Sequence, residues 1–186
     1  MKNLLRPLLL LICLLPALPA QSGWNPLAKE KDADQPGDDA GVHEAIAAFK
    51  NRDPSMQVFF DQAHGYAVFP TVGKGGMGIG GAYGKGRVFR QGGAIGSVTL
   101  TQVTLGFQLG GQAYREIIFF KDKAMLDDFT SGNFEFSAQA SAVAATAGAS
   151  ADADYNNGVA VFTLAKGGLM YEASIGGQKF SFTPAQ

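Results

Sequence analysis

Residue types that could catalyse a reaction are scarce in this sequence. Histidine occurs only at His43 and His64, each beside or at the end of a segment with the spacing of an amphipathic helix. A charge partner for a helix C-terminus is the simplest role for His64. The G-x-S-x-G, H-E-x-x-H and paired-carboxylate patterns are absent from the sequence. The sequence therefore predicts a protein that is not an enzyme; an unfamiliar acid–base site that uses these histidines is the alternative.

A glycine-rich run at residues 72–89 (VGKGGMGIGGAYGKGRVF) is the most unusual stretch. It contains G-x-G-x-x-G at 73–78 and again at 76–81, but a dinucleotide fingerprint must open a helix, and a strand-like segment follows here. The run does not match a phosphate-binding loop either, because Ile79 stands in place of the first glycine of that motif and Gly86 in place of its Ser or Thr. We therefore expect a pair of strands whose glycines allow bends and close contacts, and no cofactor.

A second short motif, DADYNNG at residues 152–158, has the beginning of a calcium loop. Its sixth position is Asn157 instead of glycine, and its twelfth is Thr163 instead of glutamate. A turn between two strands is therefore expected there, and the sequence predicts no metal site.

Charge is distributed unevenly along the chain, although the net charge is only −1. No acidic residue lies between Asp61 and Glu116, whereas eight lie from Glu116 to Glu172. The acid-free segment carries five basic residues: Lys74, Lys85, Arg87, Arg90 and Arg115. A basic segment whose backbone amides are uncovered by glycine suits the phosphate of a lipid headgroup; an ordinary solvated surface is the alternative. The small net charge gives no reason to expect nucleic-acid binding.

Residues 1–22 have the composition of a cleaved secretory signal peptide. Lys2 and Arg6 provide a positive start, an apolar run follows at 8–15, and an A-x-S cleavage pattern begins at Ala20. A membrane-spanning helix needs about 20 apolar residues, and this run is much shorter. We therefore expect a periplasmic or secreted protein whose leader is removed.

The only cysteine, Cys13, lies within this leader. It is preceded by Ile12, whereas a lipidated cysteine normally follows a small residue, so a lipoprotein is disfavoured. Cleavage would leave a chain without thiols, which excludes disulfides, thiolate catalysis and cysteine metal ligands.

Two short helices are expected after a flexible acidic linker at residues 23–40, which is polar and contains Pro and Gly. Asp53 and Pro54 have the order of an N-cap and a first helical residue. Apolar positions with helical spacing fall in two groups: Val42, Ala45, Ile46 and Phe49, and then Met56, Phe59, Phe60 and Ala63. We expect these two segments to form an amphipathic helical hairpin.

The rest of the chain has the pattern of β-strands. Apolar and small or polar residues alternate at 103–110 and 134–141, and a continuous apolar run occupies 159–164. One helix interrupts the strands, between the N-cap Asp122 and the stop at Gly132. The expected fold is α+β, with the helical hairpin packed on a Gly-rich, curved or barrel-like antiparallel sheet with one inserted helix. The helical segments argue against a small outer-membrane barrel, which is the alternative.

The order of these features resembles the SYLF-domain family of lipid-binding proteins, which includes exported bacterial members. The most specific pieces are K-G-G-x-G-x-G-G from Lys74, G-x-Q-x-G-G-Q at 106–112, and Ser131-Gly132-Asn133. The resemblance covers about residues 40–184, so the expected domain is 41–186. It implies binding to a phospholipid or membrane surface without catalysis. Fungal members also bind actin, a partner that an exported protein would not meet.

The resemblance and the basic segment together suggest the lipid-binding residues. The candidate headgroup contacts are Lys74, Lys85, Arg87 and Arg90. The candidate acyl-chain contacts are Met56, Phe59 and Phe60, with ordinary core packing as the alternative. The leading hypothesis is a non-enzymatic domain, exported to the cell envelope, that recognises anionic lipid headgroups. An envelope structural or protein-interaction module, with the acidic half as its docking surface, is the second hypothesis.

Overall fold

The computed structural model describes residues 39–106, 111–167 and 173–186. The elements in these residues are α1 (Asp39–Arg52), η1 (Pro54–Met56), α2 (Gln57–Gln62), β1 (Gly65–Arg90), β2 (Gly93–Gly106), β3 (Gln112–Phe120), α3 (Lys123–Thr130), β4 (Ser141–Ala144), η2 (Ala149–Asp152), β5 (Val159–Ala165), β6 (Ala173–Ser174) and β7 (Gln178–Pro184), where η marks a 3-10 helix. The expected signal peptide and nearly all of the expected linker lie outside the described residues. Within them, no helix is both long enough and apolar enough to cross a membrane.

The seven strands form one sheet in the order β6-β4-β5-β3-β1-β2-β7. The α+β class is therefore confirmed. The expected sheet was curved or barrel-like and antiparallel, and the antiparallel and barrel-like parts of this expectation are wrong. First, β4 and β5 pair in parallel, because the connection through η2 returns the chain to the same end of the sheet. Second, the sheet is open, with β6 and β7 at its edges. Beyond β7, the described residues continue the ladder only as an isolated bridge between Glu135 and Lys179.

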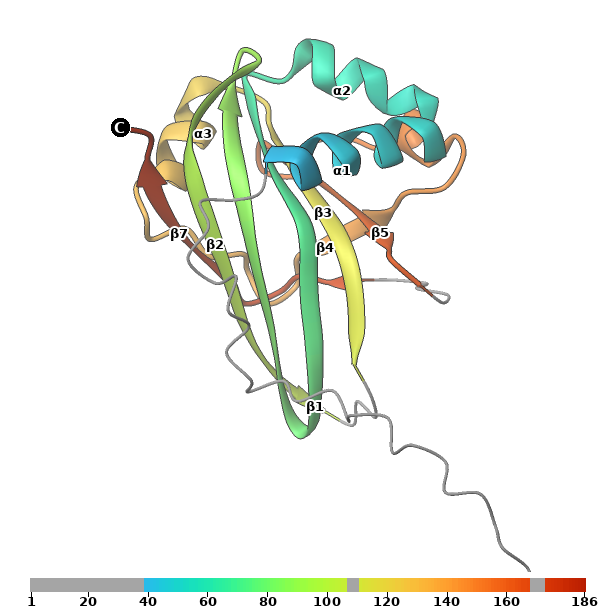
Figure 1. The fold of residues 1–186 in the computed structure, drawn as a ribbon, viewed down its shortest axis with the longest axis vertical. Coiled ribbons are helices and arrows are strands. Elements are labelled where there is room, and N and C mark those ends of the chain that lie inside the picture. Colours follow the sequence, from blue (N-terminus) through green and yellow to red (C-terminus); the bar gives the residue numbers. More distant parts are fainter. Residues whose placement is uncertain (1–38, 107–110, 168–172) are drawn as a thin grey trace, which may run out of the picture. The chain divides into compact units, whose positions relative to one another are not determined.

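Strand β1 bends back on itself within the glycine-rich run (Figure 1). Gly76, at the bend, has a φ of 155°, which residues with a side chain rarely adopt. The two arms of β1 then lie side by side. A Cβ atom at Gly84 would lie 3.1 Å from the Thr71 carbonyl oxygen, and one at Gly86 would overlap the Val68 carbonyl oxygen. The expected strand pair with close glycine contacts is confirmed.

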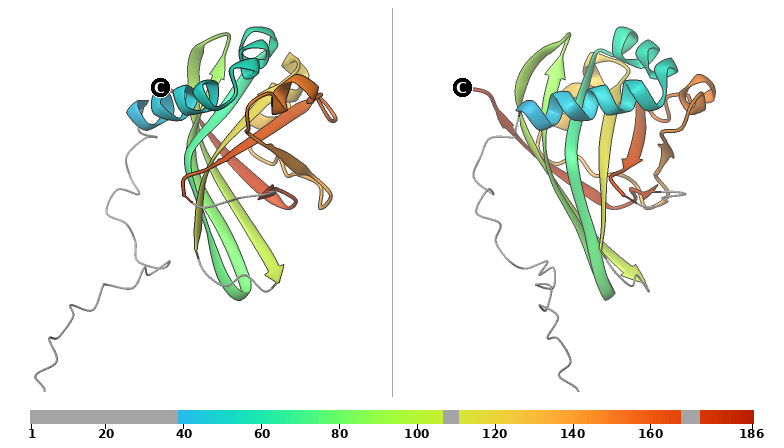
Figure 2. Two further views of the ribbon diagram at one scale, coloured as in Figure 1. Left: turned by 90° about the vertical axis from the view of Figure 1, so that its right-hand side faces the viewer. Right: turned by 45° about the vertical axis from the view of Figure 1, so that its right-hand side comes forward.

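The curved sheet has an outer face, which carries α1 and α2, and an inner face, which carries α3 (Figure 2). Buried residues on the outer face include Val42, Ala45, Phe49, Met56 and Phe59 from the helical segments, with Ile117, Phe119 and Phe162 from the sheet. Buried residues on the inner face include Leu126 and Phe129 from α3, with Phe69, Leu100, Phe120 and Phe180 from the sheet. The sheet is thus packed on both faces at its helix-covered end.

Both expected N-terminal helical segments are present, and both expected caps are confirmed. The Asp53 carboxylate accepts a hydrogen bond from the Ser55 backbone N–H at 3.1 Å, and Asp122 accepts one from Met125 at 3.0 Å. The second segment consists of η1 and a six-residue α2, so the expected two-armed hairpin is not confirmed.

Candidate functional site

The four basic residues expected to contact headgroups do not converge on one point. Lys74 alternates with the core residue Val72 and therefore faces the inner side of the sheet, where it is 9% exposed. Burial lowers the pKa of its ammonium group. Lys85 and Arg87 are two residues apart on β1, so they share the outer face, and Arg90 ends the strand.

Two of these cations are paired with carboxylates that lie far away in the sequence. Arg87 Nε lies 2.9 Å from Asp39 Oδ1 at the start of α1, and Arg90 lies 3.8 Å from Asp127 of α3. Lys85 forms no ion pair with any described residue. The basic segment is therefore partly neutralised by helices, which a count of charges along β1 does not reveal.

The residues expected to contact acyl chains lie in or against the outer core. Met56 is fully buried and Phe59 is 7% exposed. Phe60 is partly buried, packs edge-on against Tyr66 and Phe119, and has the Lys50 ammonium 4.4 Å from its ring centroid. This placement agrees with the alternative of core packing. Contact of these side chains with lipid stays a prediction that would require the helical segments to move.

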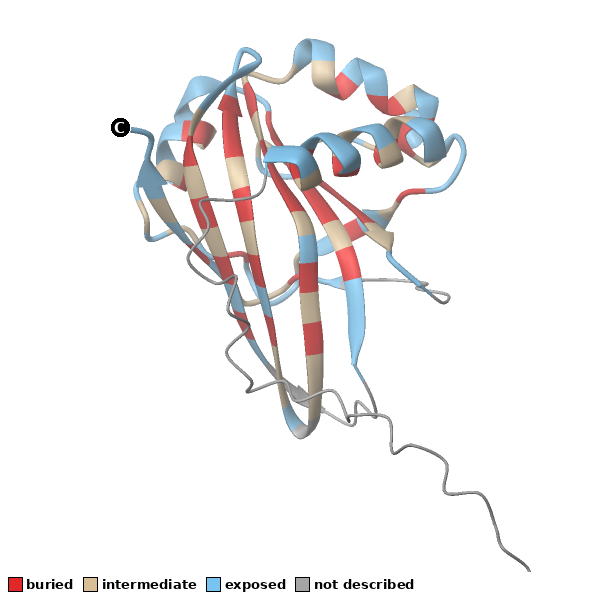
Figure 3. Cartoon of the chain, in the orientation of Figure 1, coloured by how far each residue is buried: buried red, intermediate tan, exposed pale blue. Residues whose placement is uncertain are grey.

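A different part of the sheet presents apolar side chains to solvent. Ile79 is 70% exposed, Tyr83 is 51% exposed and Val103 is 77% exposed. Tyr83 is the cross-strand partner of Thr101, and Gly81, between Ile79 and Tyr83, is the partner of Val103. These residues alternate with buried ones along β1 and β2 (Figure 3), which places them on one side. We define the outer hairpin surface as Ile79, Tyr83, Lys85, Thr101 and Val103.

The end of the sheet at which β1 bends lies beyond the part that α1 covers (Figure 1). On the covered part, Glu44 of α1 pairs with Arg115 at 2.5 Å. On the same side of the sheet, Lys166 Nζ donates a hydrogen bond to the Thr71 hydroxyl at 2.6 Å and forms no ion pair with a described residue. Strands β1 and β2 contain no carboxylate at all. The uncovered end of the sheet therefore combines exposed apolar groups with cations that have no counterion in the described chain.

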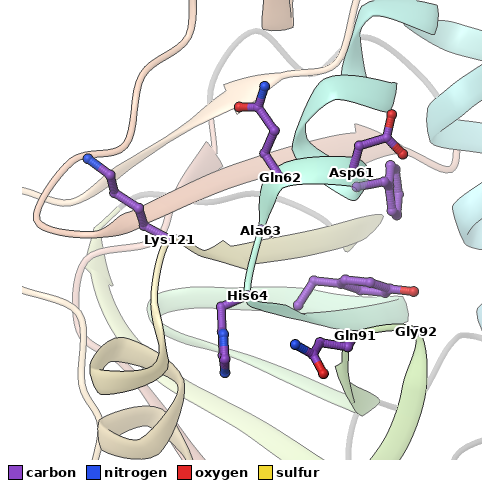
Figure 4. Close-up of a pocket in the computed structure, with 9 residues that line it drawn as sticks. Asp61, Gln62, Ala63, His64, Gln91, Gly92 and Lys121 are labelled. Carbon is purple, nitrogen blue, oxygen red and sulfur yellow. The ribbon is translucent and has the colours of Figure 1, made fainter.

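A cleft of about 560 Å³ lies between the end of α2 and the β1–β2 turn, lined in part by Asp61, His64 and Lys121 (Figure 4). The side chains of Asp61, Gln62 and Lys121 extend in different directions and do not converge. His64 Nε2 is buried and has no hydrogen-bond partner among the described residues. The cleft thus brings no carboxylate into hydrogen-bond contact with the His64 ring, as an acid–base pair would require.

The described residues contain no cluster of three or more His, Cys, Asp or Glu side chains that could hold a metal ion. The DADYNNG motif begins at Asp152, the last residue of η2, and continues into a turn in which Asn157 and Gly158 adopt φ values of 49° and 80°. The expected turn before β5 is confirmed.

Comparisons with known proteins give a family match and a curated relative. Residues 101–184 match the family model described as Las17-binding protein actin regulator (Ysc84). Beta cell expansion factor A from Aeromonas veronii is 32% identical over 137 residues, which cover 73% of this chain and 52% of the relative. The chain spans about half the length of the curated relative that it matches.

Proposed function

Because residues 101–184 of this chain belong to the Ysc84 (SYLF) family, we propose that the domain binds anionic lipid surfaces without catalysis. The observation that carries the proposal is the outer hairpin surface. Isolated exposed apolar side chains are common on proteins, whereas Ile79, Tyr83 and Val103 gather on two neighbouring strands. A Tyr ring with an apolar body and a polar tip suits the boundary between headgroups and acyl chains.

The charges on the outer face of the sheet support binding to an anionic lipid surface in particular. Lys85 and Lys166 lie on the outer face without counterions among the described residues, and no carboxylate lies on β1 or β2 to repel a phosphate. A lysine near an anionic bilayer contributes about 1 kcal/mol to binding. The apolar groups would enter the headgroup region only shallowly, which is the mode of a peripheral protein.

Flotation with vesicles tests this function. The purified protein should float with vesicles that contain phosphatidylglycerol, should float less as salt rises, and should ignore vesicles of phosphatidylcholine alone. Replacing Lys85 and Lys166 with Gln should weaken binding by about tenfold or more, since each lysine contributes about 1 kcal/mol. The Tyr83→Ser, Val103→Ser double variant should also bind less.

Matched controls lie elsewhere on the surface. Val58→Ser removes an apolar side chain that is 52% exposed on α2, and Lys121→Gln removes an exposed cation beside the cleft. Both controls should float like the unmodified protein. Absence of flotation with every vesicle, or equal losses in the control variants, would reject this surface as the lipid contact.

Export to the cell envelope is proposed on the leader pattern of residues 1–22. The mass of the protein recovered from the periplasmic fraction should correspond to a chain cut after Ala20 or Ser22. Recovery of the uncut chain from the cytoplasm would contradict export and would leave the lipid proposal unaffected.

A protein-interaction module is the second candidate, because the matching family model is described by a protein partner, Las17. The acidic half of the sequence is then the docking surface. Crosslinking in cells that traps one protein, combined with vesicle binding that does not depend on lipid charge, would favour this candidate over the first.

A further inference from the structure

The inner face of the sheet contains a group of buried polar side chains that lipid binding does not explain. We define the interior polar cluster as Gln102, Tyr114, Glu116, Thr163 and Gln178, which come from β2, β3, β5 and β7. None of them is more than 4% exposed. Buried polar groups normally have hydrogen-bond partners, because burying an unpaired one destabilises the fold.

The members of the cluster are neighbours in space. Gln178 Nε2 lies 3.0 Å from Glu116 Oε2 and 3.4 Å from the Tyr114 hydroxyl. Gln102 is the cross-strand partner of Gln178, and Thr163 is the partner of Glu116. Side chains of cross-strand partners on one face lie about 5 Å apart at their Cβ atoms. The cluster is therefore continuous from β2 through β7 to β3 and β5.

The side-chain amide donors of Gln102 and Gln178 are used, whereas several oxygens of the cluster have no partner. The Gln102 amide donates to the carbonyl oxygens of Ser174 and Gly176 at 3.2 and 2.8 Å. Four buried oxygens have no partner among the described residues: Gln102 Oε1, Glu116 Oε1, Thr163 Oγ1 and Gln178 Oε1. One of them belongs to a carboxyl group that forms no ion pair with a described residue. Lys74 faces the same side but is not within ion-pair distance of it.

We propose that the interior polar cluster binds a monovalent metal cation, sodium or potassium. The available ligands are all oxygens, which hard cations prefer, and they include no sulfur or imidazole. A single carboxylate among neutral ligands balances one positive charge, whereas a divalent ion would leave a buried excess charge. A buried water molecule could satisfy some of these oxygens, but it would not balance the charge of Glu116 in its ionised form.

Thermal unfolding of the purified protein in different chloride salts tests the site. The unfolding midpoint in sodium or potassium chloride should exceed that in choline chloride of equal ionic strength by a few degrees. Glu116→Gln, which keeps the shape and removes the charge, should abolish the difference.

Glu135→Gln is the matched control, because Glu135 is an exposed glutamate that pairs with Lys179. It should retain the ion dependence of the unmodified protein. Broadening of the ²³Na resonance by the unmodified protein, and its loss in Glu116→Gln, gives a second readout that does not depend on stability. Equal midpoints in all three salts, or stabilisation by calcium or magnesium alone, would overturn the proposal, whatever the outcome of the lipid experiments.

Discussion

The side-chain amide of Gln178 donates a 3.0 Å hydrogen bond to Glu116, and this bond crosses the inside of the sheet. Gln178 lies on β7 and Glu116 on β3, which are separated by β1 and β2 in the strand order. Side chains on strands that are separated by two others can meet only because the sheet curves strongly toward its inner face. The bond therefore fastens an edge strand to the middle of the sheet.

Removing this bond should destabilise the protein. In Gln178→Leu, the Glu116 carboxyl group and the Tyr114 hydroxyl lose a buried donor, and the free energy of unfolding should fall by about 2–3 kcal/mol. Urea unfolding measures the change. Lys179→Gln, at the neighbouring exposed position, should cost less than about 1 kcal/mol. A similar small cost for both variants would mean that the bond contributes little to stability.

Stability should depend on pH through Glu116. Its folded pKa of about 7 lies above the ordinary value of 4.5, so the folded state holds this proton more tightly than the unfolded state. The stabilising contribution is complete below about pH 4.5 and is lost as the pH rises through about 7, with a total of a few kcal/mol.

Urea unfolding between these pH values, in a buffer whose only cation is choline, measures this dependence. The groups on the same face are Tyr114, whose pKa is raised by burial, and Lys74, whose pKa is lowered by burial. Glu116→Gln should flatten the profile in this window. An unchanged profile in this variant would assign the dependence to another group.

Asp53 should give stability the opposite pH dependence, in a lower pH range. Its carboxylate accepts hydrogen bonds from Ser55, from the Gly148 N–H at 3.1 Å and from the Ser150 N–H at 2.8 Å, which join η1 to η2. Burial raises the pKa of Asp53, but these hydrogen bonds outweigh it and bring the pKa from 3.8 to about 2. The stability that this group contributes is present above about pH 4 and is lost as the pH falls through about 2.

Asp53→Ala should therefore cost about 2–3 kcal/mol at neutral pH, measured by urea unfolding. Asp61→Ala is a suitable control, because among the described residues this exposed carboxylate bonds only to Gln57 within the same helix. A loss in the control as large as in Asp53→Ala would contradict a special role for the η1–η2 contact.

Because β1 bends back on itself, alanine should cost more stability at Gly86 than at Gly73, although both glycines belong to the same run. Gly86→Ala places a Cβ atom against the Val68 carbonyl oxygen and the Phe69 ring, and should cost about 1–3 kcal/mol. Gly73→Ala meets nothing within 4 Å and should change stability little. Thermal unfolding of the two variants compares them directly, and equal midpoints would contradict the side-by-side arrangement of the two arms.

Local features of this fold could be read from the sequence. The caps at Asp53 and Asp122, the turn before β5 and the paired strands of the glycine-rich run depend on residues close together in the chain. Side-chain chemistry and backbone freedom decide such features locally.

Features that depend on distant partners could not be read in this way. Arg87 is neutralised by Asp39, 48 residues away, and the sequence gives no sign of that contact. Glu116 begins the acidic half of the sequence, yet the curvature of the sheet buries it completely. Met56 and Ile79 are both apolar, but only the packing of the helical segments decides that the first is buried and the second exposed.

The helices cover one end of the sheet and leave the bend of β1 outside them (Figure 1). The amide hydrogens of Val68 and Ile117, which lie between two packed layers, should exchange with solvent only on global unfolding. Those near Gly80 and Gly81 should exchange through local fraying. We therefore expect a rigid helix-covered end and a more mobile end at the bend of β1. A surface that binds the mobile end could change its conformation without unfolding the rest of the domain.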